Sequence, residues 1–242
     1  MPQQKTLIII PLFNEADRIV MEAYQKAFML YTNIDFVLVN DASTDKTQTI
    51  MEGFANAFQN VFCVNNKTNK GKAESIRKGV LAYLSENYIY IGYLDADLAT
   101  PFEEIVRLLN YATENPNKKI IMGARIKLMG NKVKRSLLRH YFGRVFATII
   151  SQFVLKTPVY DTQCGAKILE ANLAKKIFKH PFCTKWLFDV ELLLRFKKKD
   201  IQFASKIVEI PLNAWEEKGN SKIKLYEFFL VPFQLIKLYA HY

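Results

Sequence analysis

The sequence predicts an α/β fold in which helices flank a mostly parallel β-sheet. Short apolar runs rich in β-branched and aromatic residues alternate with longer amphipathic segments through the first half of the chain, which is the order typical of a doubly wound sheet. Polar and acidic residues directly follow several of these runs, at the positions where such sheets bind ligands. Half of the 242 residues are hydrophobic, so the chain can bury the core of one large domain.

In the first half, expected strands and helices alternate along the chain. We expect the first strand to end at Pro11, and Pro101 to start a helix in its first turn, where proline is tolerated. Ser43 or Thr44 could cap the helix that begins near Asp45. The expected strands are residues 6–10, 36–39, 61–64, 88–94 and 120–123, and the expected helices are residues 15–31, the segment from about 45, residues 71–85 and the segment from 101.

The second half has a less regular pattern. It opens with a basic amphipathic helix, which is followed by a loop over residues 159–165. The rest is expected to form helices at 171–178 and 189–198, an extended stretch at 207–211, a polar loop at 216–221 and an amphipathic or interfacial tail at 224–239.

The positive charge is concentrated in one part of the chain. The net charge is +11, and residues 115–160 contain ten Lys or Arg and no Asp or Glu. Apolar residues alternate with these charges between 137 and 153, which is the pattern of an interfacial helix on an anionic membrane. A buried core helix, a solvated basic face and a nucleic-acid surface are the alternatives, and we favour a membrane or a phosphate-bearing ligand over nucleic acid.

Neither a secretory leader nor a membrane-spanning segment is expected. The first residues lead straight into a strand, and no uncharged apolar run reaches about 18 residues. The three cysteines form no C-x-x-C pair, which favours reduced thiols and a cytosolic setting.

The strongest local signal is Asp95-Ala96-Asp97, which follows the apolar run 88–94. Two carboxylates one residue apart at the end of a strand can share one hard divalent cation, Mg²⁺ or Mn²⁺, and such ions usually also bind substrate phosphates. Solvated turn carboxylates are the alternative interpretation.

Two further polar loops, 13–15 and 40–45, are expected at the same edge of the sheet. Glu15 and Asp41 could accept hydrogen bonds from a nucleobase or ribose, with Pro11 fixing the loop that presents Glu15. Helix capping is the alternative for Asp41. Lys72, at the start of the helix after Asn69-Lys-Gly, could form an anion site with exposed backbone N–H groups, although a solvated turn would have the same composition.

Seven motifs together resemble family 2 glycosyltransferases with the GT-A fold. The first four are shared at the level of the fold: Ile10-Pro-Leu-Phe-Asn-Glu15, Val39-Asn-Asp-Ala-Ser-Thr-Asp45, Asn69-Lys-Gly-Lys72 and Asp95-Ala-Asp97. The last three are similar to the branch of dolichyl-phosphate glucose synthases and polyprenyl-phosphate mannose synthases: Asp161-Thr-Gln-Cys-Gly-Ala-Lys167, Lys185-Trp-Leu-Phe-Asp-Val-Glu-Leu192 and Trp215-Glu-Glu-Lys-Gly-Asn-Ser-Lys222. This chain departs from the family where Asn40 and Ala42 replace Asp and Gly, where Leu98 replaces Gly, and where Asn220 is inserted.

The resemblance implies a metal-dependent inverting enzyme with a nucleotide-sugar donor, most simply UDP-glucose. It implies that Asp97 and Asp95 hold Mg²⁺ or Mn²⁺, and that Asp97, Asp189 and Arg125 are catalytic. It implies donor contacts from a set of residues along the sheet edge: Pro11, Phe13, Glu15, Asp41, Lys72, Asp95, Ala96, Asp97 and Gln163. It also implies contacts to the acceptor phosphate from Arg125, Arg135, Arg139, Ser221 and Lys222.

The implied acceptor is a polyprenyl or dolichyl phosphate at the cytosolic face of a membrane, where the protein would be peripheral. We expect one GT-A domain over 1–242, with a nucleotide-binding half (1–125), an acceptor-binding half (126–222) and an amphipathic tail (223–242). A separate membrane-anchor protein is a further expected partner, and nucleic acid is not.

Two alternatives are open at this point. The same fold could transfer the sugar to a saccharide hydroxyl, with Asp189 as the base rather than as a group that orients substrate. The chain could also be a basic membrane- or nucleic-acid-binding module without chemistry. A dinucleotide-binding domain is set aside because no G-x-G-x-x-G follows the first strand.

Overall fold

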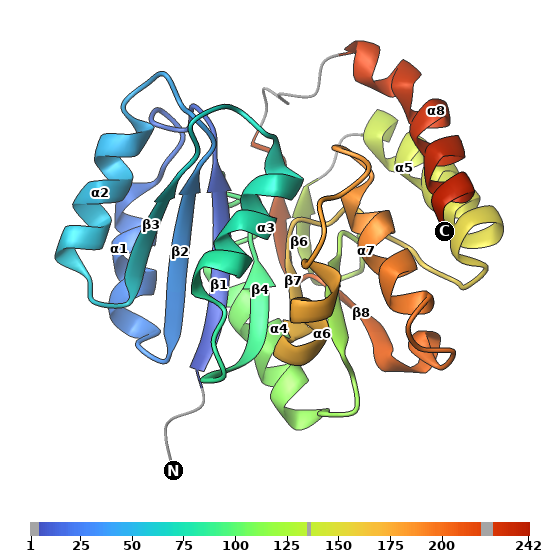
Figure 1. The fold of residues 1–242 in the computed structure, drawn as a ribbon, viewed down its shortest axis with the longest axis horizontal. Coiled ribbons are helices and arrows are strands. Elements are labelled where there is room, and N and C mark those ends of the chain that lie inside the picture. The colour runs from blue at the N-terminus through green and yellow to red at the C-terminus, as the bar shows by residue number, and fades with distance from the viewer. Residues whose placement is uncertain (1–4, 135–136, 219–224) are drawn as a thin grey trace.

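The computed structural model describes residues 5–134, 137–218 and 225–242, with side chains described in 5–134, 143–218 and 233–242. Within these ranges a seven-stranded sheet has the order β3-β2-β1-β4-β7-β5-β8, and only β7 runs antiparallel to its neighbours. The predicted α/β class with a mostly parallel sheet flanked by helices is confirmed (Figure 1). The strands are β1 (Lys5–Leu12), β2 (Ile34–Asn40), β3 (Val61–Asn65), β4 (Tyr88–Tyr93), β5 (Ile120–Ala124), β7 (Lys167–Glu170) and β8 (Ile207–Pro211).

Helices cover the two faces of the sheet with two separate cores. Alternate residues of β1 point to opposite faces, so that Ile8 joins one core and Ile9 the other. The first core contains α1 (Met21–Leu30), α2 (Thr47–Ala57) and α4 (Phe102–Glu114). The second contains α3 (Lys72–Tyr83), α6 (Ala171–Ile177) and α7 (Phe188–Lys197).

The remaining elements lie beyond β5 and β8. A small parallel ribbon pairs β6 (Lys132–Lys134) with β9 (Ala214–Glu216). Helix α5 (Leu137–Ile149) continues into a π-helix (Ile150–Leu155), and α8 (Leu225–His241) ends the chain beside them (Figure 1). Ile150 and Leu238 are buried in the same core, so these helices pack against the domain. None of the helices in the described ranges has both the length and the apolar character needed to cross a bilayer.

Three boundaries differ from the sequence prediction. β1 continues through Pro11 to Leu12, because its pairing with β2 extends that far. Its pairing with β4 stops at Ile9, so a proline at position 11 interrupts no ladder with β4. α1 begins at Met21 rather than near residue 15, since turns occupy the segment before it. α2 begins at Thr47, where Asp45 rather than Ser43 or Thr44 accepts a hydrogen bond from the Thr47 N–H at 2.9 Å.

Candidate active site

The loops that follow β1, β2 and β4 are joined by hydrogen bonds at the carboxyl edge of the sheet. The Asn14 N–H donates to Ser43 Oγ at 3.0 Å, and the Glu15 N–H donates to Thr47 Oγ1 at 2.8 Å. Arg18 then reaches Glu15 at 3.2 Å and Asp97 Oδ2 at 2.8 Å. The predicted grouping of the acidic loops is therefore present, with Arg18 as the bridge between the first loop and the third. Pro11 is the next-to-last residue of β1, just before this group, and Phe13 is partly exposed beside it.

The Asp95–Asp97 segment is held by its neighbours on the first core. The buried Tyr24 hydroxyl donates to the Ala96 carbonyl at 2.7 Å. Burial, followed by Glu15, Asp97 and Asp95, raises the pKa of Tyr24, so the phenol stays a donor. Asp97 Oδ1 accepts a hydrogen bond from the Ala99 N–H at 3.0 Å. These contacts fix the backbone from which both carboxylates project.

Asp95 lies between α3 and the loop before β7. Its Oδ1 forms an ion pair with Lys72 Nζ. A Cβ on Gly165 would overlap the Asp95 carboxylate, so only glycine fits against it. Burial acts to lower the pKa of Lys72, but Asp95 and then Asp189 outweigh it and leave that pKa raised. Lys72 is thus paired with the carboxylate of the β4 loop and also lies in the field of the carboxylate at the start of α7.

Asp41 is buried and occupies the position where an anion site was predicted. Its carboxylate accepts hydrogen bonds from the N–H groups of Lys70 at 2.8 Å and Gly71 at 2.7 Å, and from Asn66 Nδ2 at 2.8 Å. The backbone donors before α3 are therefore used by a protein carboxylate. None of the hydrogen bonds found for Asp41 among the described residues goes to α2, so Asp41 does not cap that helix.

Asp189 lies buried in the second position of α7. Its Oδ1 accepts hydrogen bonds from the Tyr93 hydroxyl and from Lys167 Nζ, the latter at 2.6 Å. Lys167 is fully buried and also donates to the Cys164 carbonyl at 2.6 Å. Burial, followed by Asp189, raises the pKa of Tyr93. Glu191 points into a different cluster with Arg195.

Arg125 is engaged by the segment that precedes β7. Its Nε and Nη2 contact the two oxygens of Asp161 at 2.6 and 2.7 Å, and its guanidinium lies 5.5 Å from the Trp215 ring. Glu209 on β8 accepts hydrogen bonds from the N–H groups of Tyr160 and Asp161, both at 2.7 Å. These contacts fix the segment that carries Gln163. Within the described part of the chain, the buried Nε2 of Gln163 has no hydrogen-bond partner.

Cys164 is a buried thiol in the same segment. Burial, followed by Asp161, raises its pKa to about 11. The thiol therefore stays protonated at neutral pH and is not a nucleophile.

Each of the three joined loops contains a non-glycine residue in the left-handed region. These residues are Asn14 at φ 51°, Ala42 at φ 59° and Leu98 at φ 50°. Asparagine adopts this conformation readily, whereas alanine and leucine do so at a cost. Ala42 and Leu98 are the two positions where the family pattern has glycine. This chain therefore keeps the left-handed backbone conformation there, although the residues are not glycine.

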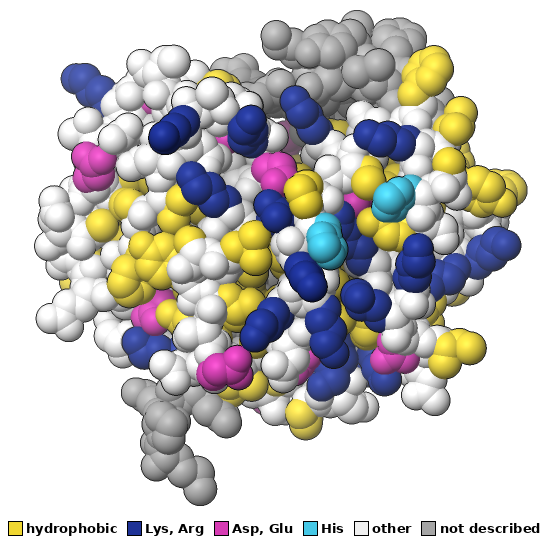
Figure 2. Space-filling model, in the orientation of Figure 1, with side chains coloured by type: hydrophobic (Ala, Val, Ile, Leu, Met, Phe, Trp, Pro, Cys, Tyr) yellow, Lys and Arg dark blue, Asp and Glu magenta, His cyan; other side chains and the backbone are white. Residues whose placement is uncertain are grey.

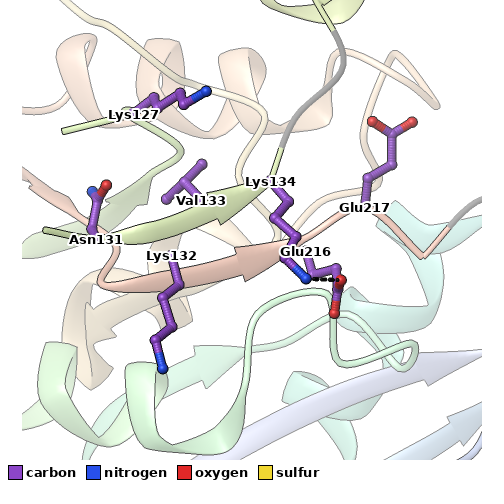
Figure 3. A pocket seen from close by; sticks show the side chains of 7 residues that line it. All are labelled: Lys127, Asn131, Lys132, Val133, Lys134, Glu216 and Glu217. Carbon is purple, nitrogen blue, oxygen red and sulfur yellow. Dashed lines mark hydrogen bonds and ion pairs between the residues drawn. The ribbon is translucent and has the colours of Figure 1, made fainter. Parts of the chain in front are cut away.

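The β6–β9 ribbon lies beside the Asp95–Asp97 loop. The Glu216 N–H donates to the Ala99 carbonyl at 2.9 Å, two residues from Asp97. An open cavity of about 470 Å³ lies on the ribbon and is lined by both charge signs; Figure 3 shows Lys134 paired across the two strands with Glu216 at 2.8 Å. The site carboxylates do not line this cavity.

Several residues predicted to contact the acceptor phosphate lie in segments whose backbone or side chains are not described. Arg135, Ser221 and Lys222 lie outside the described residues, and the side chain of Arg139 is not described. β6 and β9 are parallel, and Lys134, the residue before Arg135, lies opposite Glu216, which precedes the 219–224 segment.

The carboxylates fit a hard divalent cation. Asp95 and Asp97 have 39% and 24% of their side-chain surface exposed and offer oxygen ligands one residue apart. No group of three or more His, Cys, Asp or Glu suited to a metal occurs among the described residues. Two carboxylates with the remaining positions supplied by phosphate oxygens and water is the usual arrangement for Mg²⁺ with a nucleotide.

Sequence reasoning missed four side chains that organise this site, Arg18, Tyr24, Tyr93 and Lys167. Each acts through a contact distant in sequence, and three of them carry no local signal. Lys167 has such a signal, because it is a single charged residue between the uncharged segments Cys-Gly-Ala and Ile-Leu.

Comparisons with known proteins agree with the geometry. The model of the family described as Glycosyl transferase family 2 matches residues 7–178. Dolichyl-phosphate beta-glucosyltransferases of Saccharomyces cerevisiae and Homo sapiens are both 28% identical; the matches cover 90% and 96% of this chain and 69% and 71% of those proteins. An uncharacterized protein of Methanocaldococcus jannaschii is 30% identical over 96% of this chain and 97% of its own length.

Solved structures show the same fold. Glucosyl-3-phosphoglycerate synthase from Mycobacterium tuberculosis, in complex with Mn²⁺, UDP and glucosyl-3-phosphoglycerate, superposes with a TM-score of 0.71 at 14% identity, over 98% of this chain and 79% of that one. The same enzyme with Mn²⁺, UDP-glucose and glycerol 3-phosphate also has a TM-score of 0.71. These neighbours are GT-A glycosyltransferases, so the predicted GT-A fold is confirmed.

Proposed function

Because the chain belongs to glycosyl transferase family 2, we propose that it transfers glucose from UDP-glucose to a polyprenyl or dolichyl phosphate. The relatives named dolichyl-phosphate beta-glucosyltransferase align over most of the chain, which supports this donor and acceptor. Family membership favours this activity over a binding module without chemistry. The chain is a glycosyltransferase.

The observation that carries the proposal is the contact between Glu216 and Ala99. It joins the ribbon of the acceptor half to the loop of the metal-binding carboxylates. A donor diphosphate at Asp95 and Asp97 and an acceptor phosphate beside the ribbon would then meet at the carboxyl edge of the sheet. Lys72, paired with Asp95, would lie near the diphosphate, and Arg125, paired with Asp161, lies against Trp215 of the ribbon.

The chemistry needs little from the protein beyond position and charge. A phosphate monoester has its second pKa near ~6 and is largely ionised at neutral pH. One of its oxygens forms a bond to the anomeric carbon while the bond from that carbon to the UDP oxygen breaks, so the configuration inverts and UDP leaves. A divalent cation, when bound at Asp95 and Asp97, neutralises the charge that develops on the leaving diphosphate. Mn²⁺ is our first choice, since structures of the same fold contain it.

We also propose peripheral contact with an anionic membrane through the C-terminal helices. Exposed apolar side chains project from the α5 and π-helix segment and from α8, namely Val145, Phe153, Phe233, Ile236 and Tyr239. Figure 2 shows Lys and Arg gathered on the neighbouring face over α6 and α7. Between 171 and 199 the two acidic residues, Asp189 and Glu191, are both buried, and Lys175 pairs with Glu86 at 3.4 Å. Positive charge therefore exceeds negative charge on this face, which favours binding to an anionic interface. The cytosolic side of the membrane and a separate anchor protein remain predictions.

The test is transfer of label to lipid. Purified protein, labelled UDP-glucose, polyprenyl phosphate and Mn²⁺ or Mg²⁺ should produce a labelled product that partitions into organic solvent, and EDTA should abolish it. GDP-mannose should be a poorer donor. No lipid-linked product with any donor would contradict the proposal.

A further inference from the structure

We infer that Lys167 and Tyr93 are positioning residues that hold Asp189 so that its second oxygen faces the donor sugar. The inference rests on the proposed function, which supplies the donor. It concerns a side-chain cluster that links β4, β7 and α7 and includes the buried lysine.

Both donors converge on one oxygen of Asp189. The Tyr93 hydroxyl and Lys167 Nζ each bond to Oδ1, and no hydrogen bond to Oδ2 is found among the residues the structure describes. Two donors from two strands hold this oxygen in place and restrict the carboxylate, and its other oxygen is available to a substrate hydroxyl.

The buried lysine is costly for stability alone. Lysine is almost never fully buried unless it is paired, and a buried ion pair contributes little net stability compared with apolar residues of the same size. Lys167 has no exposed surface; its ammonium donates to the Cys164 carbonyl and to Asp189 and lies 5.4 Å from the centre of the Tyr93 ring. Its position is explained if it also serves the site.

The cluster is connected to the donor-binding edge. Lys72 is paired with Asp95 and also feels the charge of Asp189. Lys72 Nζ lies 5.7 Å from the ring of Phe188, the residue before Asp189. Asp189 is therefore close to the carboxylates that would hold the diphosphate and is placed to reach the attached sugar.

The molecule contains a matched control at the other end of β4. Asp35 accepts hydrogen bonds from Lys5 Nζ at 3.1 Å and from the Tyr88 hydroxyl at 2.7 Å. This cluster has the same three residue types, but it lies at the amino ends of β1, β2 and β4. Changes there alter packing and charge without reaching the site.

The first experiment compares Tyr93→Phe with Tyr88→Phe, since each removes one hydroxyl bonded to an aspartate. Calorimetry of UDP-glucose and of UDP should show that Tyr93→Phe weakens UDP-glucose binding by about 10-fold and leaves UDP binding unchanged, as expected for loss of a hydrogen bond to a charged group. Tyr88→Phe should change neither. Equal weakening of both ligands, or no change in either, would overturn the inference.

The second experiment uses Lys167→Met, Asp189→Asn and the double variant. If Lys167 acts through Asp189, adding Asp189→Asn to Lys167→Met costs less than twofold further in kcat, whereas independent roles would multiply the two losses. Urea unfolding identifies any variant that does not fold, in which case the tyrosine pair decides. Wild-type protein that binds UDP-glucose but transfers nothing would refute the proposed acceptor and leave the affinity test valid; failure to bind UDP-glucose at all would overturn both.

Discussion

Two Lys–Asp–Tyr clusters lie at opposite ends of β4, and they differ in what surrounds them. At the amino end, Lys5, Asp35 and Tyr88 meet at the edge of the sheet, and the Lys5 side chain is 41% exposed. At the carboxyl end, Lys167, Asp189 and Tyr93 are buried beside Lys72 and the Asp95–Asp97 loop. The residue types are the same, so position on the sheet separates a structural cluster from a candidate catalytic one.

The reason for the difference lies in sheet geometry. In a parallel sheet the loops at the carboxyl ends of the strands converge, and ligands bind there. The amino-end cluster lies at the opposite ends of the same strands, away from these loops. The predictions below contrast the two ends, from the largest expected effect to the smallest.

Asp97→Ala should lower kcat by about 10³-fold or more, because the leaving diphosphate loses its metal-holding carboxylate. Stability should change by less than about 1 kcal/mol, since the ion pair with Arg18 is partly exposed. Asp35→Ala should show the reverse, with loss of stability and unchanged kcat. Turnover assays and urea unfolding of both variants check this, and an active Asp97→Ala enzyme would refute the metal-site assignment.

Asp189→Asn separates the two acceptor classes. With an ionised phosphate acceptor no base is needed, so kcat should fall by about 10–100-fold through misplaced substrate, compared with about 10³-fold or more if the residue is a base for a hydroxyl. Asp35→Asn is the control at the other end and should leave kcat unchanged. Complete loss of turnover in Asp189→Asn alone would favour the saccharide acceptor.

Gly165→Ala tests the close approach of Asp95. The added Cβ would overlap that carboxylate, so we expect about 1–3 kcal/mol of destabilisation and weaker UDP-glucose binding. Gly53→Ala in α2, where a Cβ meets nothing within 4 Å, should instead stabilise the protein by about 0.5–1 kcal/mol. Thermal unfolding measures both, and a neutral Gly165→Ala would show that the loop relaxes easily.

Ala42→Gly should have the smallest effect. Left-handed backbone costs alanine about 1–2 kcal/mol, and glycine gives back part of this through greater freedom in the unfolded chain. We expect about 0.5–1 kcal/mol of net stabilisation at unchanged kcat. Denaturant midpoints measure the gain, and a loss of stability would mean that the Ala42 side chain contributes packing that outweighs the strain.

Much of the sheet was predictable because periodicity is a local property. The first five strands and the helices between them follow from apolar runs and turn residues. β7 was not among the predicted strands, because Lys167–Glu170 is short and has a charged residue at each end. β6 and β9 have three residues each and become strands only by pairing with one another.

The site was predictable where a motif carries its own chemistry. Asp95, Asp97, Asp41 and Glu15 occur in polar loops after apolar strands, and the structure groups these loops at one edge. The contacts that Arg18 and Lys167 make join segments far apart in the chain, and no local pattern determines such a pairing. The use of Asp41 to fill the backbone donors before α3 is likewise a tertiary result.

The reversed strand β7 has a consequence for how the polypeptide acquires its native state. β4 and β5 share no direct ladder, since β7 lies between them and pairs with both. During synthesis β1 to β4 can assemble early, but the open side of β4 must wait until α4, β5 and α5 have emerged. Such non-local pairing slows folding and leaves a sheet edge exposed to aggregation in the meantime. β7 begins with Lys167, which holds Asp189. The sheet is therefore completed and Asp189 is positioned in the same late step, and an incompletely folded chain would be inactive.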